Sequence, residues 1–175
     1  MDSGIESGSD RILKMIKKGV TVQEIIDINK KMGKHSFKAK YTFIVGYPSE
    51  TEEELMQSVK LALQLVKDNK NAYTPFFIYT AYPGVELWEI AKQYGVYEPK
   101  KLEDWETFDH EKAYLHYKWL DERRIKMMQN LAFTSLFANK NIRFKISKIY
   151  LKFLFDMYQP IAKLRFSHNL YQFPI

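Results

Sequence analysis

The sequence contains no cysteine among its 175 residues, and this absence excludes several kinds of chemistry. Without thiols the chain can form no disulfide, supply no thiolate nucleophile and ligate no metal or iron–sulfur cluster through sulfur. Long apolar runs are missing too, since no stretch approaches the ~18 uncharged apolar residues of a membrane-spanning helix. The first residues show neither a basic start nor an apolar stretch. A secretory signal is therefore not expected, and the predicted compartment is cytoplasmic.

Acidic side chains are scarce in the second part of the chain. Residues 1–111 carry 15 basic and 18 acidic side chains, whereas residues 112–175 carry 12 and 3, a net charge of +9. A basic, aromatic-rich segment of this kind suits a membrane surface or an acidic partner. Lysines on the solvated face of a helical extension would give the same count. No signature of a nucleic-acid-binding fold accompanies the charge, so no nucleic-acid partner is expected.

Residues 1–95 alternate between strand-like and helix-like segments. Compact β-branched and aromatic runs at residues 41–48 and 75–79 predict buried strands, and a shorter strand is predicted to end near Ile5. A helix is predicted after each strand, with capping-box spacing at Thr21/Glu24 and Thr51/Glu54. Strands about 35 residues apart, each followed by a helix, predict an α/β fold with right-handed βαβ units and a parallel sheet.

From about residue 111 the pattern is helical. One helix is predicted over residues 111–137, and a second over residues 141–158, which should end before Pro160. The second helix has a wide apolar face, with a narrow polar stripe opposite it that contains Lys145, Lys148, Lys152 and Asp156. Such a face needs a partner, which can be the first part of the chain, another subunit or a lipid interface.

Ligands of parallel α/β folds bind in the loops that follow the strands. Three loops fit this rule, at residues 6–10, 46–51 and 80–85, and small residues in each let the backbone approach a ligand. Glu6 lies at a strand end among glycine and serine, where it can accept hydrogen bonds from ligand hydroxyl or ammonium groups, or equally serve as a turn or capping carboxylate.

Other candidate sites receive less support from the sequence. The glutamates at positions 50, 52, 53 and 54 are predicted to be surface charges that complement the dipole of the following helix. The four histidines lack the spacing of a metal site, and no nucleophile elbow is present. A hydrolase or a zinc enzyme is therefore not expected.

Three segments, in order and at the proper spacing, resemble one family. They are GIESGSDRILKMIKKGVT, YTFIVGYPSETEEEL and FIYTAYPGVELWEIA. Together they are similar to the fourth, fifth and sixth βα units of the radical S-adenosylmethionine (SAM) barrel. The resemblance covers residues 4–95. The most similar subgroup has an N-terminal cobalamin-binding domain and includes anaerobic magnesium-protoporphyrin ester cyclase-like proteins.

This resemblance implies roles for individual residues. Glu6 and Ser7 match positions that contact the ribose or methionine part of SAM. Three residues of the fifth strand match the segment along the adenine, and a proline shapes the loop after it: Ile44, Val45, Gly46 and Pro48. The turn after the sixth strand lies on the substrate side and matches Tyr79, Pro83 and Gly84. Two positions depart from the superfamily pattern: Thr42 replaces a glycine, and Glu50 lies one position later than the motif's glutamate and is assigned no ligand role.

The family's chemistry also needs a CxxxCxxC loop, whose thiolates hold a 4Fe-4S cluster that binds SAM. A chain without cysteine cannot assemble that cluster. The resemblance therefore implies the C-terminal half of a larger enzyme: residues 1–95 as half of the barrel, residues 96–110 as a linker and residues 111–175 as a basic helical extension. SAM would meet a partial site here, and the 4Fe-4S cluster and any cobalamin would be bound only in the full-length parent.

The expected partners follow from this interpretation. The isolated chain should be inactive, should pair with the missing N-terminal half of the enzyme and should self-associate through open sheet edges. The alternative is a non-catalytic interaction module, which would bind a membrane surface or a partner protein through its basic helical tail. In that case the protein would be peripheral to a membrane.

Overall fold

The computed structural model describes residues 1–35, 37–108, 112–138, 149–168 and 170. It shows a mixed α/β chain with parallel strands in one open sheet, consistent with part of a radical SAM barrel. The predicted fold class is confirmed. Within the described residues the sheet has four strands, which are β1 (Asp2–Glu6), β2 (Ala39–Val45), β3 (Ala72–Tyr73) and β4 (Phe76–Ile78).

The helices follow the strands in the predicted order. In the first part they are α1 (Asp10–Met15), α2 (Val22–Met32), α3 (Glu52–Asp68) and α4 (Glu86–Gln93). In the second part they are α5 (Glu122–Ala138) and α6 (Ile149–Ser167), and short 3-10 turns lie at η1 (Leu102–Thr107) and η2 (Ala113–His116). None of the helices in the described part of the chain has the length and apolarity needed to cross a membrane.

Strand β2 is the centre of the sheet. It pairs in parallel with β1 on one side, where Ser3 is opposite Tyr41, and with β3 and β4 on the other, where Phe43 is opposite Phe76. Because the strands are parallel, the chain segments that follow β1, β2 and β4 leave the sheet at the same edge. The three candidate loops begin at this edge.

Local sequence signals determine where the two longest helices of the first part begin. Thr21 and Thr51 each cap a helix, and in both cases the glutamate three residues later completes a capping box with the backbone of the threonine. Both boxes were predicted from their spacing and are confirmed. Each satisfies backbone N–H groups that would otherwise lack a partner at the start of a helix.

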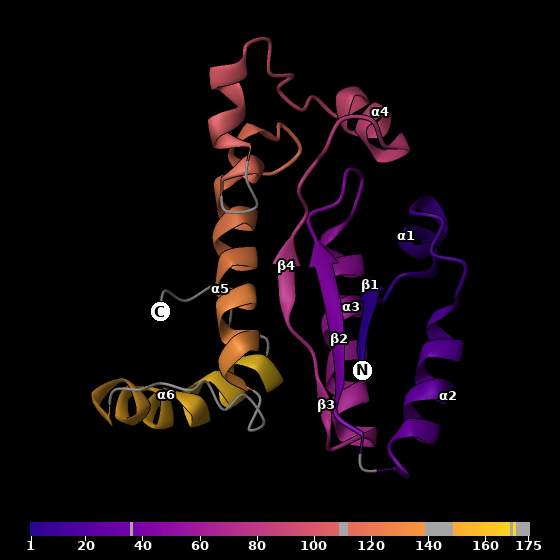
Figure 1. Cartoon of the computed structure of the whole chain (residues 1–175), viewed down its shortest axis with the longest axis vertical. Helices are drawn as coiled ribbons and strands as arrows, with labels where there is room; N and C mark the ends of the chain where they lie inside the picture. Colours follow the sequence, from indigo (N-terminus) through magenta and orange to yellow (C-terminus); the bar gives the residue numbers. More distant parts are fainter. Residues whose placement is uncertain (36, 109–111, 139–148, 169, 171–175) are drawn as a thin grey trace.

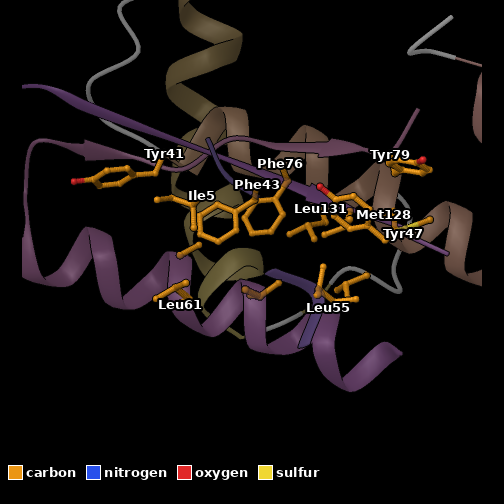
Figure 2. Close-up of a cluster of buried hydrophobic side chains, with 14 of the residues drawn as sticks. Ile5, Tyr41, Phe43, Tyr47, Leu55, Leu61, Phe76, Tyr79, Met128 and Leu131 are labelled. Atoms are coloured by element: carbon orange, nitrogen blue, oxygen red, sulfur yellow. The ribbon is translucent and has the colours of Figure 1, made fainter. Parts of the chain in front are cut away.

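The hydrophobic core forms on one face of the sheet, between its strands and the helices packed against them. Alternate residues of β2 are fully or nearly buried, and the ring of Phe43 stacks on that of Phe76 with centroids 4.9 Å apart. Figure 2 shows Leu55 and Leu61 of α3 in the same cluster as Leu131 of α5. The second part of the chain therefore shares a core with the first.

Helix α5 lies along the side of β4 that faces away from β2 (Figure 1). The backbone N–H of Phe76 donates to the hydroxyl of Ser135 at 3.0 Å, and Ser135 is buried. The ring of Phe166, from α6, contacts Phe76 edge-on at a centroid distance of 6.0 Å. The Ser135 hydroxyl therefore accepts from a backbone N–H of β4 that could otherwise pair with a further strand.

The prediction of one helix over residues 111–137 is wrong at its start. Tyr117 forms an antiparallel bridge with Val96, and helix α5 begins only at Glu122. Asp121 explains the boundary, because its carboxylate accepts a hydrogen bond from the backbone N–H of Arg124 at 2.7 Å, in the manner of a helix cap.

The predicted end of the last helix is also wrong, since α6 continues through Pro160 to Ser167. A proline inside a helix removes one hydrogen bond, at a cost of about 3 kcal/mol. Burial of Ala162 and Phe166 beyond the proline offsets that cost. Residues 141–148 of the predicted helix, Lys145 and Lys148 included, lie outside the described residues, as do the side chains of Lys152 and Asp156.

Candidate functional site

Glu6 ends β1 in an unusual conformation. Its φ is +72°, in the left-handed region that residues other than glycine rarely adopt, and the strand register shifts just before it. Lys18 donates to Oε1 of Glu6 at 3.2 Å, while the buried Oε2 has no hydrogen-bond partner among the described residues. The carboxylate thus has one oxygen anchored and one available to a donor, which fits the ligand role better than the capping role.

Ser7 is fully buried and committed to internal contacts. Its hydroxyl shares a hydrogen bond with that of Ser58 on α3 at 3.3 Å and accepts one from the backbone N–H of Ser9 at 3.1 Å. Next to it, Gly8 packs so closely on α3 that a Cβ there would lie 2.5 Å from the carbonyl oxygen of Gln57. Ser7 therefore contributes to the docking of this loop on α3, and its predicted contact with SAM stays a prediction.

The four residues predicted to contact SAM or shape its site at the end of β2 and in the second loop differ in burial. Ile44 is half-buried on the face of β2 opposite to Phe43, whereas Val45, Gly46 and Pro48 are buried. Gly46 has φ +87°, and a Cβ there would lie 3.1 Å from the sulfur of Met128. Glycine is required at this turn both by the backbone and by the neighbouring helix.

The prediction that Glu50 is a surface charge is wrong. Its side chain is buried, with one oxygen accepting from the backbone N–H of Gly46 at 2.5 Å and the other without a partner in the described part of the structure. Burial raises the pKa of Glu50 to about 7, although the Gly46 hydrogen bond and the charge of Arg124 act in the opposite direction. The tight turn made possible by Gly46 folds this glutamate back onto the loop.

Glu54 is also buried, contrary to the prediction for the four glutamates. Arg11 of α1 binds its carboxylate at 2.6 Å, and the hydroxyl of Ser9 donates to it at 2.9 Å. The Arg11 hydrogen bond is the main reason that the pKa of Glu54 falls to about 2. Glu54 ties the first loop to the start of α3, while Glu52 and Glu53 remain partly or fully exposed as predicted.

Tyr79, on the predicted substrate side, is buried just after β4. Its hydroxyl has no hydrogen-bond partner among the described residues, and burial raises the pKa of Tyr79 to about 12. Its ring lies 5.0 Å from that of Tyr47. Burial, followed by the charges of Glu6 and Glu50, raises the pKa of Tyr47 far above its usual range. The Tyr47 hydroxyl therefore interacts electrostatically with a carboxylate from each of the first two loops.

Pro83 and Gly84, the other two substrate-side residues, are exposed in the turn that leads into α4. Gly84 has φ +86°, and no atom of the described residues lies within 4 Å of the position a Cβ would take. The structure therefore separates these two residues, in an open turn, from the buried Tyr79.

Three residues from the second part of the chain contact the candidate loops and were not predicted from the sequence. The indole N–H of Trp119 donates to the carbonyl of Gly46 at 3.1 Å, and Arg124 donates to the carbonyl of Glu50 at 2.9 Å. The hydroxyl of Tyr117 donates to the carbonyl of Tyr79 at 3.2 Å. No local sequence signal could reveal these contacts, because each partner is more than 35 positions away.

The cofactors implied by the resemblance fit this chain unequally. The oxygen of Glu6 that has no partner among the described residues suits the hydroxyl or ammonium groups of SAM, and the half-buried Ile44 of the neighbouring strand suits the face of its adenine ring. A 4Fe-4S cluster does not fit, because the chain has no cysteine. Among the described residues, no group of three or more His, Asp or Glu side chains is placed to hold a metal ion. No residue is assigned to cobalamin.

The arrangement defines part of a parallel α/β domain, with candidate ligand groups at the carboxyl ends of its strands. Comparison with known proteins agrees with this class, since residues 1–62 match the family model of the Radical SAM superfamily. Over 88 residues the chain is 47% identical to an uncharacterized methyltransferase of Pyrococcus horikoshii, a stretch that covers 50% of this chain and 18% of the relative.

Two further relatives are both named tRNA-2-methylthio-N(6)-dimethylallyladenosine synthase. The protein of Buchnera aphidicola is 30% identical over 55% of this chain and 22% of its own length. That of Neisseria meningitidis is 40% identical over 46% of this chain and 18% of its own length. The chain thus spans about a fifth of the length of the curated relatives that it matches.

Proposed function

We propose that this chain is a C-terminal fragment of a radical SAM enzyme, of the oxidoreductase or methyltransferase type, in which residues 1–95 form half of the barrel and supply part of the SAM pocket and of the substrate side. The observation that carries the proposal is Glu6, which lies within the residues that match the superfamily. It ends its strand in a left-handed conformation, and one buried oxygen, which has no partner among the described residues, can accept from a ligand donor. The methyltransferase and synthase relatives support the reaction class.

The proposal divides the work between this chain and the rest of the enzyme. The chain contains no cysteine, so the 4Fe-4S cluster must come from the missing N-terminal half, and the chain alone should be inactive. We also propose, on the motif resemblance, that the parent enzyme belongs to the subgroup with a cobalamin-binding domain. A coding sequence for CxxxCxxC just upstream of this chain, preceded by such a domain, is the expected finding. Upstream sequence unrelated to either would contradict both statements.

The SAM site is tested by NMR on the isotopically labelled chain, because weak binding to a partial site can still be detected. Addition of millimolar SAM should shift the backbone amides of residues 4–8 and 44–46, and ATP at the same concentration should not. Glu6→Gln should abolish most of the shift, while Glu53→Gln, which changes an exposed carboxylate, should retain it. Identical spectra with and without SAM would refute the proposed site.

A second candidate function is attachment to an anionic membrane surface. On α6, Met157, Ile161 and Leu164 are 56%, 51% and 55% exposed and recur at helical spacing. Residues 112–175 add a net charge of +9, which complements anionic lipids. This patch, which we call the α6 stripe, favours a peripheral membrane contact over a solvated helix.

Flotation of the whole chain with vesicles tests this second function. The chain should float with vesicles of phosphatidylglycerol and phosphatidylcholine and much less with phosphatidylcholine alone. Replacement of the three residues of the α6 stripe by serine should abolish flotation. No binding to either vesicle rules out the membrane function, and concentration-dependent dimerisation lost in the same variant would indicate a second copy as the occupant of the stripe.

A further inference from the structure

Both polar backbone groups of Gly46 are held by side chains of the same chain. The N–H donates to the carboxylate of Glu50 at 2.5 Å, and the carbonyl accepts from the indole of Trp119 at 3.1 Å. The two peptide groups that flank Gly46 each take part in one of these hydrogen bonds, so neither can turn without breaking one. The orientation of this turn is therefore fixed from two directions.

The segment that contains Trp119 makes further contacts around the same turn. Arg124 donates to the carbonyl of Glu50 at 2.9 Å, and Arg123 pairs with Glu52 at 2.5 Å. The space over Gly46 is closed by the same segment, since a Cβ there would lie 3.1 Å from the sulfur of Met128 and 3.6 Å from the side chain of Leu120. The helix start and the loop before it thus enclose the turn.

The same segment also holds the loop after β4. The hydroxyl of Tyr117 donates to the carbonyl of Tyr79 at 3.2 Å and accepts from the N–H of Ala81 at 2.6 Å. Its ring stacks on that of Trp119 with centroids 4.3 Å apart. Residues 117–128, here called the clamp segment, therefore connect two of the three candidate loops.

We propose that the clamp segment is a positioning element of the candidate site, and that Trp119 and Glu50 are the positioning residues that hold the Gly46 turn in its ligand-binding geometry. In naming SAM as that ligand, the inference rests on the proposed function. Neither residue needs to touch SAM. Each acts through Gly46, so the affinity of the site depends on Trp119, which lies 73 positions from Gly46 in the sequence.

The charge state of Glu50 gives this arrangement a spectroscopic signature. The charged and titratable groups that interact with its carboxyl are Arg124 from α5, Glu54 from α3 and Arg11 from α1. Tyr47 and the backbone N–H groups of Gly46 and Tyr47 contribute from its own turn. With a pKa of about 7, Glu50 changes charge in the neutral range. Because its oxygen accepts directly from Gly46, the resonance of that amide should follow the titration.

The experiment follows the Gly46 amide by NMR in the whole chain, where only seven glycines need to be assigned. In the wild type its proton shift should titrate with a midpoint near pH 7, and in Glu50→Gln it should stay constant. Trp119→Phe keeps an aromatic ring beside Tyr117 but loses the N–H, and should speed hydrogen exchange at Gly46 about tenfold. Glu53→Gln should leave both observations unchanged.

Two further variants keep the test decisive if Trp119→Phe does not fold. Arg124→Gln removes the contact with the Glu50 carbonyl from a partly exposed position and should also speed exchange at Gly46. Glu50→Ala should do the same, and Glu50→Gln, which still offers an oxygen to the N–H, should restore slow exchange. Unchanged Gly46 exchange in every folded variant overturns the inference.

Titration with SAM separates this inference from the proposed function. If the variants loosen Gly46 but SAM shifts no wild-type resonance, the clamp is confirmed and the proposed function fails. If SAM binds the wild type and Trp119→Phe equally well, the proposed function stands and the positioning role is refuted. Weaker SAM binding by Trp119→Phe and unchanged binding by Glu53→Gln support both.

Discussion

Two separate features of the structure require glycine at position 46. Its φ of +87° disfavours any side chain, and Met128 closes the space where a Cβ would stand. Gly46→Ala should therefore destabilise the chain by about 2 kcal/mol in urea unfolding, part from the backbone and part from the displaced helix.

Gly19 provides the matched control, because it has φ +73° and, in the part of the chain that the structure describes, nothing lies within 4 Å of its Cβ position. Gly19→Ala should cost only the backbone part, about 1 kcal/mol. Equal losses in the two variants would show that Met128 yields freely and that the clamp segment is loosely packed.

Glu50 makes stability depend on pH in an unusual direction. Its pKa in the folded chain, about 7, lies above the ordinary value of 4.5, so the folded state binds the proton more tightly than the unfolded state does. The contribution of Glu50 to the free energy of unfolding is complete below pH 4.5. It is lost as the pH rises through 7, by up to about 3 kcal/mol.

Glu50→Gln tests this direction, since an amide does not titrate. Between pH 5 and pH 8, urea unfolding should show the wild type losing stability relative to the variant. Glu54 cannot produce this trend, because its pKa of about 2 places its own change at acidic pH and with the opposite sign. A constant difference between the two proteins would contradict the burial of a titrating Glu50.

At the scale of elements, helix α5 begins at Glu122, whereas the sequence predicts a helix that begins at residue 111. Asp121 accepts from the N–H of Arg124, as a residue before the first turn does. Asp121→Ala should therefore destabilise the chain by about 1 kcal/mol. In an uninterrupted helix over residues 111–137 the same change would be stabilising, since alanine is the better helix former. The sign of the change in urea unfolding decides between the two.

Elements with local signals were predicted well. The helices capped by Thr21 and Thr51 begin where their capping boxes place them, and the β-branched run of residues 41–48 contains most of β2. Strand β3 was not predicted because it has only two residues. They form a strand only by pairing with Ala39 and Lys40 of β2, which are distant in the sequence. The residues before α5 were misassigned because the bridge from Tyr117 to Val96 overrides their helical pattern.

The candidate site was predictable to the same extent. Strand ends and small residues pointed to Glu6 and Gly46, and both lie at the carboxyl edge of the sheet. Glu50 was misjudged because acidic residues at a helix start are usually solvated, whereas this one folds back onto Gly46. Trp119 was missed because its role depends on the docking of α5, which no local pattern specifies.

At the scale of the whole molecule, the two edges of the sheet differ. Helix α5 occupies the outer side of β4, whereas within the described residues β1 pairs only with β2. An unpaired parallel edge is a template for another strand. We therefore propose that the isolated chain self-associates at micromolar concentration, and that β1 is the edge that pairs. Sedimentation velocity over a range of concentrations measures the association.

Two variants identify the edge. Asp2 is exposed at the start of β1, where proline is tolerated but removes a backbone donor, so Asp2→Pro should raise the dissociation constant about tenfold. Phe77, 43% exposed on β4, is the control for nonspecific apolar contact, and Phe77→Ser should leave association unchanged. A monomer at all concentrations would refute the proposal. Loss of association in Phe77→Ser alone would move the contact to the exposed side chains of β4.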